Sequence, residues 1–129
     1  MRYLGIDYGS KRIGLSISDE EGRMAFPHSV VENDSHALEN ISNIIIGNAV
    51  DTVVVGESKN FKGEANEIQK SIDKFAKALE AKEMELDIVF EPEFMTSSQA
   101  EKIQGKNNML DASAATIILQ SFLDRKLSN

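Results

Sequence analysis

Acidic residues that follow apolar runs are the side chains of this sequence best suited to chemistry. Asp7 ends the apolar run that begins after Arg2, and a charge in such a place is costly unless it is paired or used. Two later apolar runs are followed by Glu57 and by Glu93, and a predicted helix begins with Asp111. Converging carboxylates repel one another unless a cation lies between them, and ligands that are all oxygen favour Mg²⁺ or Mn²⁺. Two such ions stabilise the attacking and leaving oxygens of a phosphodiester, so the chemistry that this pattern favours is metal-dependent cleavage of a nucleic acid.

Each of these carboxylates also has a purely structural interpretation. Asp7 is suited to accept hydrogen bonds from the backbone of the turn at residues 8–9. Asp111 is suited to cap a helix or to interact with its dipole. Glu93 and Glu57 are each also explained as exposed loop charges. The catalytic interpretation therefore depends on whether the fold brings the carboxylates together.

Four basic residues are candidates for contacts with a nucleic-acid backbone. Lys11 and Arg12 lie just after the first carboxylate, and Lys59 and Lys62 lie in a polar loop that follows the fourth predicted strand. Basic loops commonly contact phosphate groups, so we expect these four side chains to position a substrate. For Arg12, a solvated position on a strand is an equally good interpretation.

The hydrophobic pattern predicts strands first and then an alternation of helices and strands. Residues 2–7 form a nearly continuous apolar run, as in a strand buried on both faces, and residues 12–18 alternate between apolar and polar. From Ser35, a plausible N-cap, the apolar residues recur at helical spacing. The predicted elements are strands at 2–7, 12–18 and 23–31, a helix at 35–49, a strand at 52–56, a helix at 64–83, a strand at 86–90 that Pro92 ends, a short helix from 96 or 97 to 103, and a helix at 110–125.

This order of elements predicts an α/β fold with one five-stranded mixed sheet and helices on both faces. Strands one to three are expected to be antiparallel, and strands one, four and five parallel. Pro27 lacks a donor N–H, which places the third strand at a sheet edge or at a bulge. Sites in such sheets form beyond the carboxyl ends of the parallel strands, which is where the acidic residues collect.

Composition sets limits on the class of protein. The chain has 129 residues, a typical size for one domain, so residues 1–129 are expected to form a single domain. The chain has no Cys, no visible secretory signal and no apolar run long enough to span a bilayer, so a cytoplasmic protein is expected. A net charge of −7 argues against a broad non-specific nucleic-acid binder. It does not exclude a groove of carboxylates that divalent ions make locally positive.

The opening and closing motifs resemble those of a known family. Residues 4–14, Leu-Gly-Ile-Asp-Tyr-Gly-Ser-Lys-Arg-Ile-Gly, are similar to the opening signature of the YqgF/RuvX family, Holliday-junction-resolvase-like nucleases with an RNase H-like fold. The resemblance continues through residues 25–27, 53–56, 75–79, 96–100 and 111–124. It thus covers nearly the whole chain.

The resemblance implies an activity and a set of site residues. The family is linked to processing of the 5′ end of precursor 16S rRNA, and its acidic triad is thought to hold divalent metal. Carried over by position, the triad is Asp7, Glu93 and Asp111. The implied partners are precursor rRNA, with branched DNA and ribosomal particles as further candidates, and the implied assembly is a monomer or a weak homodimer.

Two departures from the family pattern leave alternatives open. The family typically has Asp-Glu-Arg after strand five, whereas this chain has Pro92-Glu93-Phe94, and Gly56 is followed by Glu57 rather than by an apolar residue and Pro. A nucleic-acid- or ribosome-binding module with weakened turnover is therefore a second hypothesis, and Glu57 is a candidate substitute ligand. An actin-like ATPase, suggested by the Asp-Tyr-Gly turn, needs two lobes, and 129 residues supply one.

Overall fold

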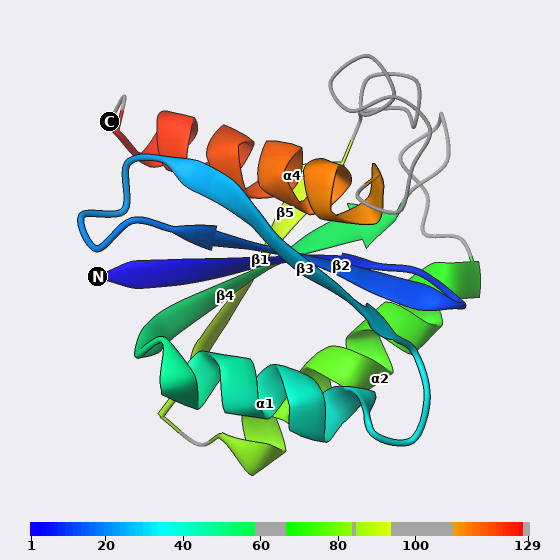
Figure 1. Ribbon diagram of the computed structural model, residues 1–129. Coiled ribbons are helices and arrows are strands. Elements are labelled where there is room, and N and C mark those ends of the chain that lie inside the picture. Colours follow the sequence, from blue (N-terminus) through cyan, green and yellow to red (C-terminus); the bar gives the residue numbers. More distant parts are fainter. Residues whose placement is uncertain (59–66, 84, 94–109, 128–129) are drawn as a thin grey trace.

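A five-stranded mixed sheet runs through the centre of the structure in the order β3-β2-β1-β4-β5 (Figure 1). The computed structural model describes residues 1–58, 67–83, 85–93 and 110–127. Strand β1 pairs with β2, and β2 with β3, in antiparallel fashion, whereas β1, β4 and β5 are parallel, as predicted. The elements are β1 (Arg2–Tyr8), β2 (Arg12–Ser18), β3 (Ala25–Glu32), α1 (Ala37–Gly47), β4 (Val50–Ser58), α2 (Glu67–Lys82), β5 (Asp87–Glu93) and α4 (Leu110–Leu127).

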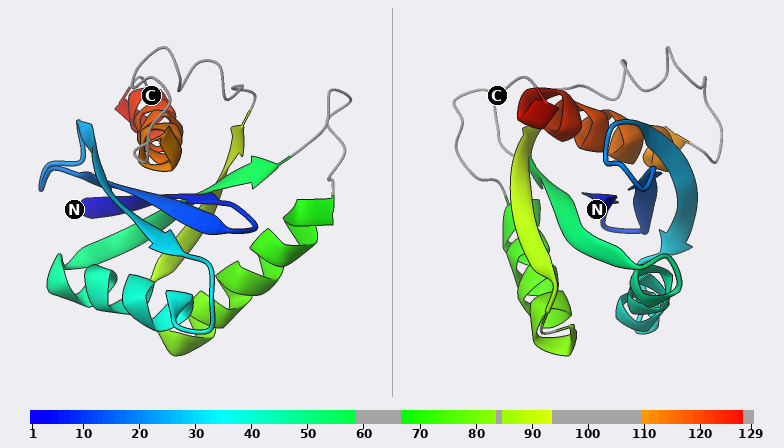
Figure 2. Two further views of the ribbon diagram at one scale, coloured as in Figure 1. Left: turned by 45° about the vertical axis from the view of Figure 1, so that its right-hand side comes forward. Right: turned by 90° about the vertical axis from the view of Figure 1, so that its left-hand side faces the viewer.

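Helices cover both faces of the sheet, so the protein has three layers. Figure 2 shows α1 and α2 on one face and α4 on the other. Each face has its own apolar core. The core beneath α1 and α2 includes Leu4, Ile6 and Val55, and the core beneath α4 includes Tyr3 and Val54. Within the described ranges, no helix is long and apolar enough to cross a membrane.

The two prolines both lie in edge strands. Pro27 lies in β3 at one edge, and the register between β2 and β3 shifts beside it, so the prediction of an edge strand or a bulge is confirmed. The prediction that Pro92 ends the fifth strand is wrong, because β5 continues to Glu93. An edge strand needs hydrogen-bonding groups on one side only and therefore tolerates proline. As a result, Glu93 ends a strand opposite Ser58 instead of lying in a loop.

The first helix begins later than predicted. Helix α1 starts at Ala37 with His36 as its N-cap residue and no side-chain cap, so Ser35 is not the cap. Asp34 orders this approach instead. Its Oδ1 accepts a hydrogen bond from the His36 N–H at 2.9 Å, and its carbonyl accepts one from the Ala37 N–H at 3.1 Å. The short helix predicted at 96–103 lies outside the described residues.

Helix α4 packs against β1 at a position that only glycine fits. A Cβ atom added to Gly5 would lie 2.3 Å from Ser16 Oγ, 2.8 Å from Leu119 Cβ and 2.9 Å from the Ala115 carbonyl oxygen. The Ser16 hydroxyl donates a hydrogen bond to that same carbonyl at 2.8 Å. Backbone, helix and β2 are therefore in direct contact here, and this contact fixes the height of α4 above the sheet.

Substituting Gly5 by alanine tests this packing. We expect Gly5→Ala to lower the free energy of unfolding by roughly 1–3 kcal/mol, because the added methyl group forces helix and sheet apart. Gly47→Ala is the matched control, since a Cβ atom at Gly47 meets nothing within 4 Å. Urea denaturation followed by circular dichroism measures both, and equal stabilities of the two variants would contradict this packing.

Candidate functional site

The face of the sheet to which each carboxylate belongs follows from the alternation of strand residues. In β1, Leu4 and Ile6 lie in the core beneath α1 and α2, whereas Tyr3 lies in the core beneath α4 and Gly5 contacts α4 directly. Asp7 is the next residue of the α4 face. It is half-buried and occupies the carboxyl-terminal part of β1. The first predicted site residue thus lies on the face that α4 covers.

Glycines flank Asp7 on both neighbouring strands. Gly14 of β2 is its direct partner in the register. On the other side, Val55 of β4 pairs with Ile6, so Gly56 is the residue of β4 that comes level with Asp7. The two positions directly level with Asp7 therefore add no side chain of their own. A divalent ion and its remaining ligands need room beside the first carboxylate.

The first turn of α4 lies toward the same end of β1. Ala115 contacts Gly5, and Asp111 precedes Ala115 by four residues, about 6 Å along the helix axis. Figure 1 shows α4 beginning on the side of the molecule where β1 and β4 end. The backbone of Asp111 is thereby near the strand end that carries Asp7. The side chains of Asp111 and Glu93 lie outside the described part of the structure.

One acidic residue of this region has a structural role instead. Glu91 is buried, and its carboxylate accepts hydrogen bonds from Arg125 Nη1 at 3.0 Å and from Ser121 Oγ at 3.2 Å. The second carboxylate oxygen of Glu91 is bound by Arg125 Nη2, which makes the pair bidentate. Glu91 thus ties the end of α4 to β5. In the sequence Glu91 directly follows the predicted fifth strand, and its pairing with Arg125, distant in sequence, was not evident.

Glu57 belongs to the opposite face. Val53 and Val55 lie in the core beneath α1 and α2, and Glu57 is the next residue of that set along β4. Its position in the register is opposite Pro92. Among the residues that the structure describes, no group of three or more His, Cys, Asp or Glu residues could hold a metal ion. Because the side chains of Glu93 and Asp111 are outside that set, the acidic triad stays a prediction.

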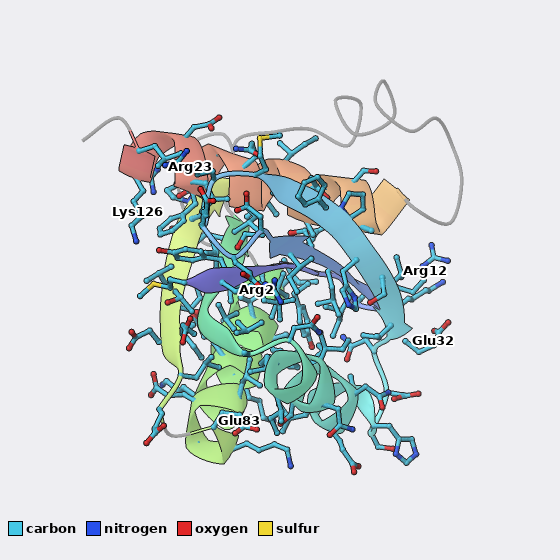
Figure 3. All side chains as sticks on the ribbon, turned by 60° about the vertical axis from the view of Figure 1, so that its left-hand side comes forward. Arg2, Arg12, Arg23, Glu32, Glu83 and Lys126 are labelled. Atoms are coloured by element: carbon cyan, nitrogen blue, oxygen red, sulfur yellow. The ribbon has the colours of Figure 1, made fainter. Side chains whose placement is uncertain are left out.

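The turn after β1 presents basic side chains to solvent. Lys11 and Arg12 are exposed, and Figure 3 shows Arg12 pointing away from the body of the protein near Glu32. Asn33 holds this turn in place, because its Nδ2 donates to the Gly9 carbonyl at 2.8 Å and its backbone N–H donates to the Lys11 carbonyl at 2.9 Å. The role of Asn33 was not predicted, although an Asn-Asp pair directly after a strand is a turn signal. Lys59 and Lys62 lie outside the described residues.

The ion pair between Glu91 and Arg125 predicts a clear difference between two arginine variants. Arg125→Ala should lower the free energy of unfolding by about 2–4 kcal/mol, because it leaves the Glu91 carboxylate, 3% exposed, without its cation. The range is below that of a fully buried pair because Arg125 itself is 55% exposed.

Arg23→Ala is the control for this measurement. It breaks the Arg23–Glu21 pair, whose side chains are 67% and 70% exposed, and should change stability by less than about 0.5 kcal/mol. Chemical denaturation of both variants gives the comparison. A loss for Arg125→Ala no larger than that for Arg23→Ala would contradict a structural role for Glu91.

Comparison with known proteins adds a family and a fold. A family model described as "RuvX: Holliday junction resolvase" matches residues 1–125. A protein of Sulfurihydrogenibium sp. (strain YO3AOP1) named "Putative pre-16S rRNA nuclease" is 34% identical over 131 residues, which cover 96% of this chain and 90% of that protein. A protein of the same name from Geobacillus sp. (strain WCH70) is 33% identical over 138 residues, which cover 98% and 99% of the two chains.

Solved structures of two resolvases share the fold. The structure of T. thermophilus RuvC in complex with a Holliday junction substrate matches with a TM-score of 0.63 at 17% identity and covers 98% of this chain and 96% of its own. The Fowlpox virus resolvase, in complex with Holliday junction DNA, matches with a TM-score of 0.64 at 14% identity and covers 98% and 99%. The RNase H-like sheet expected from the sequence is thereby confirmed.

Proposed function

Since the chain belongs to the RuvX family, as its motifs implied, we propose that it is a metal-dependent endonuclease that cleaves phosphodiester bonds in precursor 16S rRNA. The observation that carries the proposal is the position of Asp7, half-buried at the carboxyl end of β1, flanked by glycines and on the face covered by α4. The names of the full-length relatives support the choice of substrate. The family description supports branched DNA as the second candidate substrate.

In this proposal Asp7, Glu93 and Asp111 hold one or two Mg²⁺ or Mn²⁺ ions. The donor set fits such ions, because it is made of carboxylate oxygens and the chain has no Cys. Bound divalent ions would supply Lewis acidity toward the oxygens of the scissile phosphodiester. The chain's own contribution is rigidity. Asp7 and Glu93 sit in strands of one sheet, and Asp111 sits in the first turn of a helix packed on that sheet.

Strand alternation supports the choice of Glu93 over Glu57 as the middle member of the triad. Positions 89 and 91 of β5 belong to the α4 face, since Val89 packs in the core beneath α4 and Glu91 pairs with Arg125 of α4. Position 93 is the next of this series, and Asp7 belongs to the same face. Position 57 belongs to the opposite face. Continuation of β5 through Pro92 is what keeps position 93 in this series.

Four basic residues would offset, where the substrate binds, the negative charge of the whole chain. A protein with a net charge of −7 needs local cations to hold a polyanion. In the proposal Lys11, Arg12, Lys59 and Lys62 contact phosphates on either side of the cleaved bond. Such contacts position the substrate without reading its sequence. We further propose a cytoplasmic protein of one domain, a monomer or weak homodimer, that meets its RNA on ribosomal particles.

Neutral, nearly isosteric substitutions test the carboxylate assignment. Asp7→Asn, Glu93→Gln and Asp111→Asn should each slow cleavage of a precursor 16S rRNA fragment at least about 100-fold in Mg²⁺ or Mn²⁺, because each removes a charged oxygen ligand. Glu57→Gln is the matched control at the same carboxyl end of the parallel strands. Its cleavage rate should stay within about twofold of that of the unchanged protein.

A parallel assay with a four-way DNA junction identifies the substrate. Preferred cleavage of the RNA is expected, and the four variants should rank alike on either substrate. If Glu57→Gln lost as much activity as Glu93→Gln, the assignment by strand face would be wrong. If Asp7→Asn retained full cleavage, metal-dependent catalysis at this site would be wrong.

Salt dependence tests the role of the turn. The logarithm of the RNA-binding constant should fall linearly with the logarithm of salt concentration, and Lys11→Ala and Arg12→Ala should each reduce the slope by roughly one, the value for one lost phosphate contact. Lys74→Ala, on the exposed side of α2, should leave the slope unchanged. An unchanged slope for both turn variants would remove this turn from the substrate path.

A further inference from the structure

Strand β5 forms one edge of the sheet, and among the described residues the surface is hollowed on both of its faces. It is the last strand of the sheet and pairs only with β4, so the groups on its outer edge have no strand partner among the described residues. The other edge strand, β3, is protected by Pro27 and by a register shift. In β5, Pro92 comes near the end, so residues 87–91 form an edge without proline.

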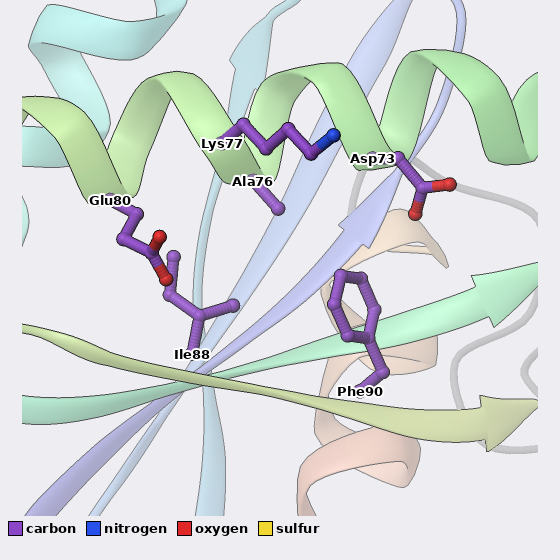
Figure 4. Close-up of a pocket in the computed structure, with 6 residues that line it drawn as sticks. All are labelled: Asp73, Ala76, Lys77, Glu80, Ile88 and Phe90. Atoms are coloured by element: carbon purple, nitrogen blue, oxygen red, sulfur yellow. The ribbon is translucent and has the colours of Figure 1, made fainter.

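The first hollow lies between β5 and α2. Its volume is about 290 Å³, and Figure 4 shows its apolar floor and charged rim. Phe90, which is 38% exposed, projects toward the helix beside Ala76. Asp73 and Glu80 bring carboxylates to the rim. An exposed aromatic ring in a hollow with a polar rim is typical of an anchor site for a partner protein.

The second hollow lies on the other face of β5, beneath the end of α4. Its volume is about 450 Å³, and its apolar walls include Tyr3, Val89 and Phe122. Glu80 and Ile88 line both hollows, so the two adjoin each other at β5. Successive side chains of an added strand point to opposite faces of the sheet. A strand added to β5 would therefore place its side chains alternately in the two hollows.

We propose that the open edge of β5 binds an extended, basic segment of a partner protein, which adds to the sheet as a sixth strand. Main-chain hydrogen bonds to an exposed strand edge supply affinity, and pockets for alternate side chains supply specificity. The two hollows offer such pockets. The site includes neither Asp7 nor the first turn of α4, so the proposal stands independently of the nuclease activity.

The charge of the surface around β5 favours a basic partner segment. On β5 itself Asp87 is an exposed acidic residue, whereas Glu91 is buried and paired with Arg125. Among the described residues, three acids, Asp73, Glu80 and Asp87, line the hollows, together with Lys77 and Lys126. One of these, Lys126, already contacts the Tyr3 hydroxyl and lies 4.8 Å from the centre of its ring. A basic peptide is attracted to this surface, and a polyanion such as RNA is repelled.

A second copy of the chain is a poor occupant of the same edge. Antiparallel pairing of β5 with itself would place Asp87 of one copy near the acidic end of the other strand. Like charges opposite each other across a strand pair are destabilising. Each copy also carries a net charge of −7. Repulsion thus favours a basic partner over self-association.

Peptide titration of the full chain tests the proposal. The probe is the heptapeptide Lys-Val-Arg-Ile-Lys-Val-Arg, and the readout is the backbone amide spectrum of the ¹⁵N-labelled protein. We expect the largest shifts at residues 87–91 and at least tenfold weaker binding of the acidic peptide Glu-Val-Asp-Ile-Glu-Val-Asp. Methylating alternate backbone nitrogens along the pairing edge of the basic peptide should abolish binding, whereas methylating the other edge should not.

A matched pair of variants separates local from overall charge. Asp73→Lys combined with Glu80→Lys should weaken the basic peptide at least tenfold and reverse the preference between the two peptides. Glu21→Lys combined with Glu39→Lys changes the net charge by the same amount at exposed sites elsewhere and should leave binding within about twofold. Both double variants should cleave RNA at the unchanged rate.

Four results would each overturn the proposal. They are the absence of shifts in β5, equal binding of both methylated peptides, RNA causing the same β5 shifts, and concentration-dependent β5 shifts that accompany dimerisation without peptide. Loss of cleavage in Asp7→Asn with peptide binding intact would be expected, since the two sites are separate.

Discussion

The contact between α4 and Gly5 is the constraint on which the functional part of the structure depends. At this point helix, β1 and the Ser16 hydroxyl meet so closely that a single carbon added to Gly5 would collide with Ser16 and with Ala115 and Leu119 of α4. Close backbone approach fixes the helix along the strand as well as above it. The first turn of α4, which carries Asp111, therefore has a defined place relative to Asp7. A loosely packed helix would not hold two potential ligands at a constant separation.

The far half of α4 is fixed by polar contacts. Glu91 binds Arg125 and Ser121, and the Gln120 side chain accepts a hydrogen bond from the Ala25 N–H at 2.8 Å and donates one to the Arg23 carbonyl at 3.1 Å. The helix is thus attached to both edge strands of the sheet. A buried carboxylate that serves this purpose must keep its cation, because an unpaired buried charge is costly. Glu91 therefore has a structural role, which differs from the ligand role proposed for Glu93 two residues away.

Strand alternation divides the acidic residues between the two faces of the sheet. Asp7 and Glu91 belong to the face beneath α4, whereas Glu57 belongs to the face beneath α1 and α2. Glycine occupies the position level with Asp7 on both neighbouring strands. The proposed peptide edge on β5 uses side chains of α2 and the opposite end of α4. The two proposed activities accordingly use separate surfaces of one small sheet.

The order and direction of the strands were predictable from the sequence because hydrophobic periodicity and the handedness of crossover connections leave few alternatives. The position of Asp7 at the end of β1 was predictable for the same reason. The continuation of β5 through Pro92 was not, because only the sheet order reveals that this strand lies at an edge. Nor was the role of Glu91, since its partner Arg125 is 34 residues away. The cap of α1 was assigned to Ser35 by residue type, but Asp34 makes the contacts.

Paramagnetic relaxation by Mn²⁺ is the most direct test of the central claim, that Asp7 lies at the centre of a divalent-metal site. In a titration of the ¹⁵N-labelled protein, the account predicts that the amide signals of Asp7, Gly14 and Gly56 broaden first and that Asp7→Asn removes this broadening. Early broadening on the opposite face, around Asp73 and Glu80, with Gly14 and Gly56 unaffected, would contradict it.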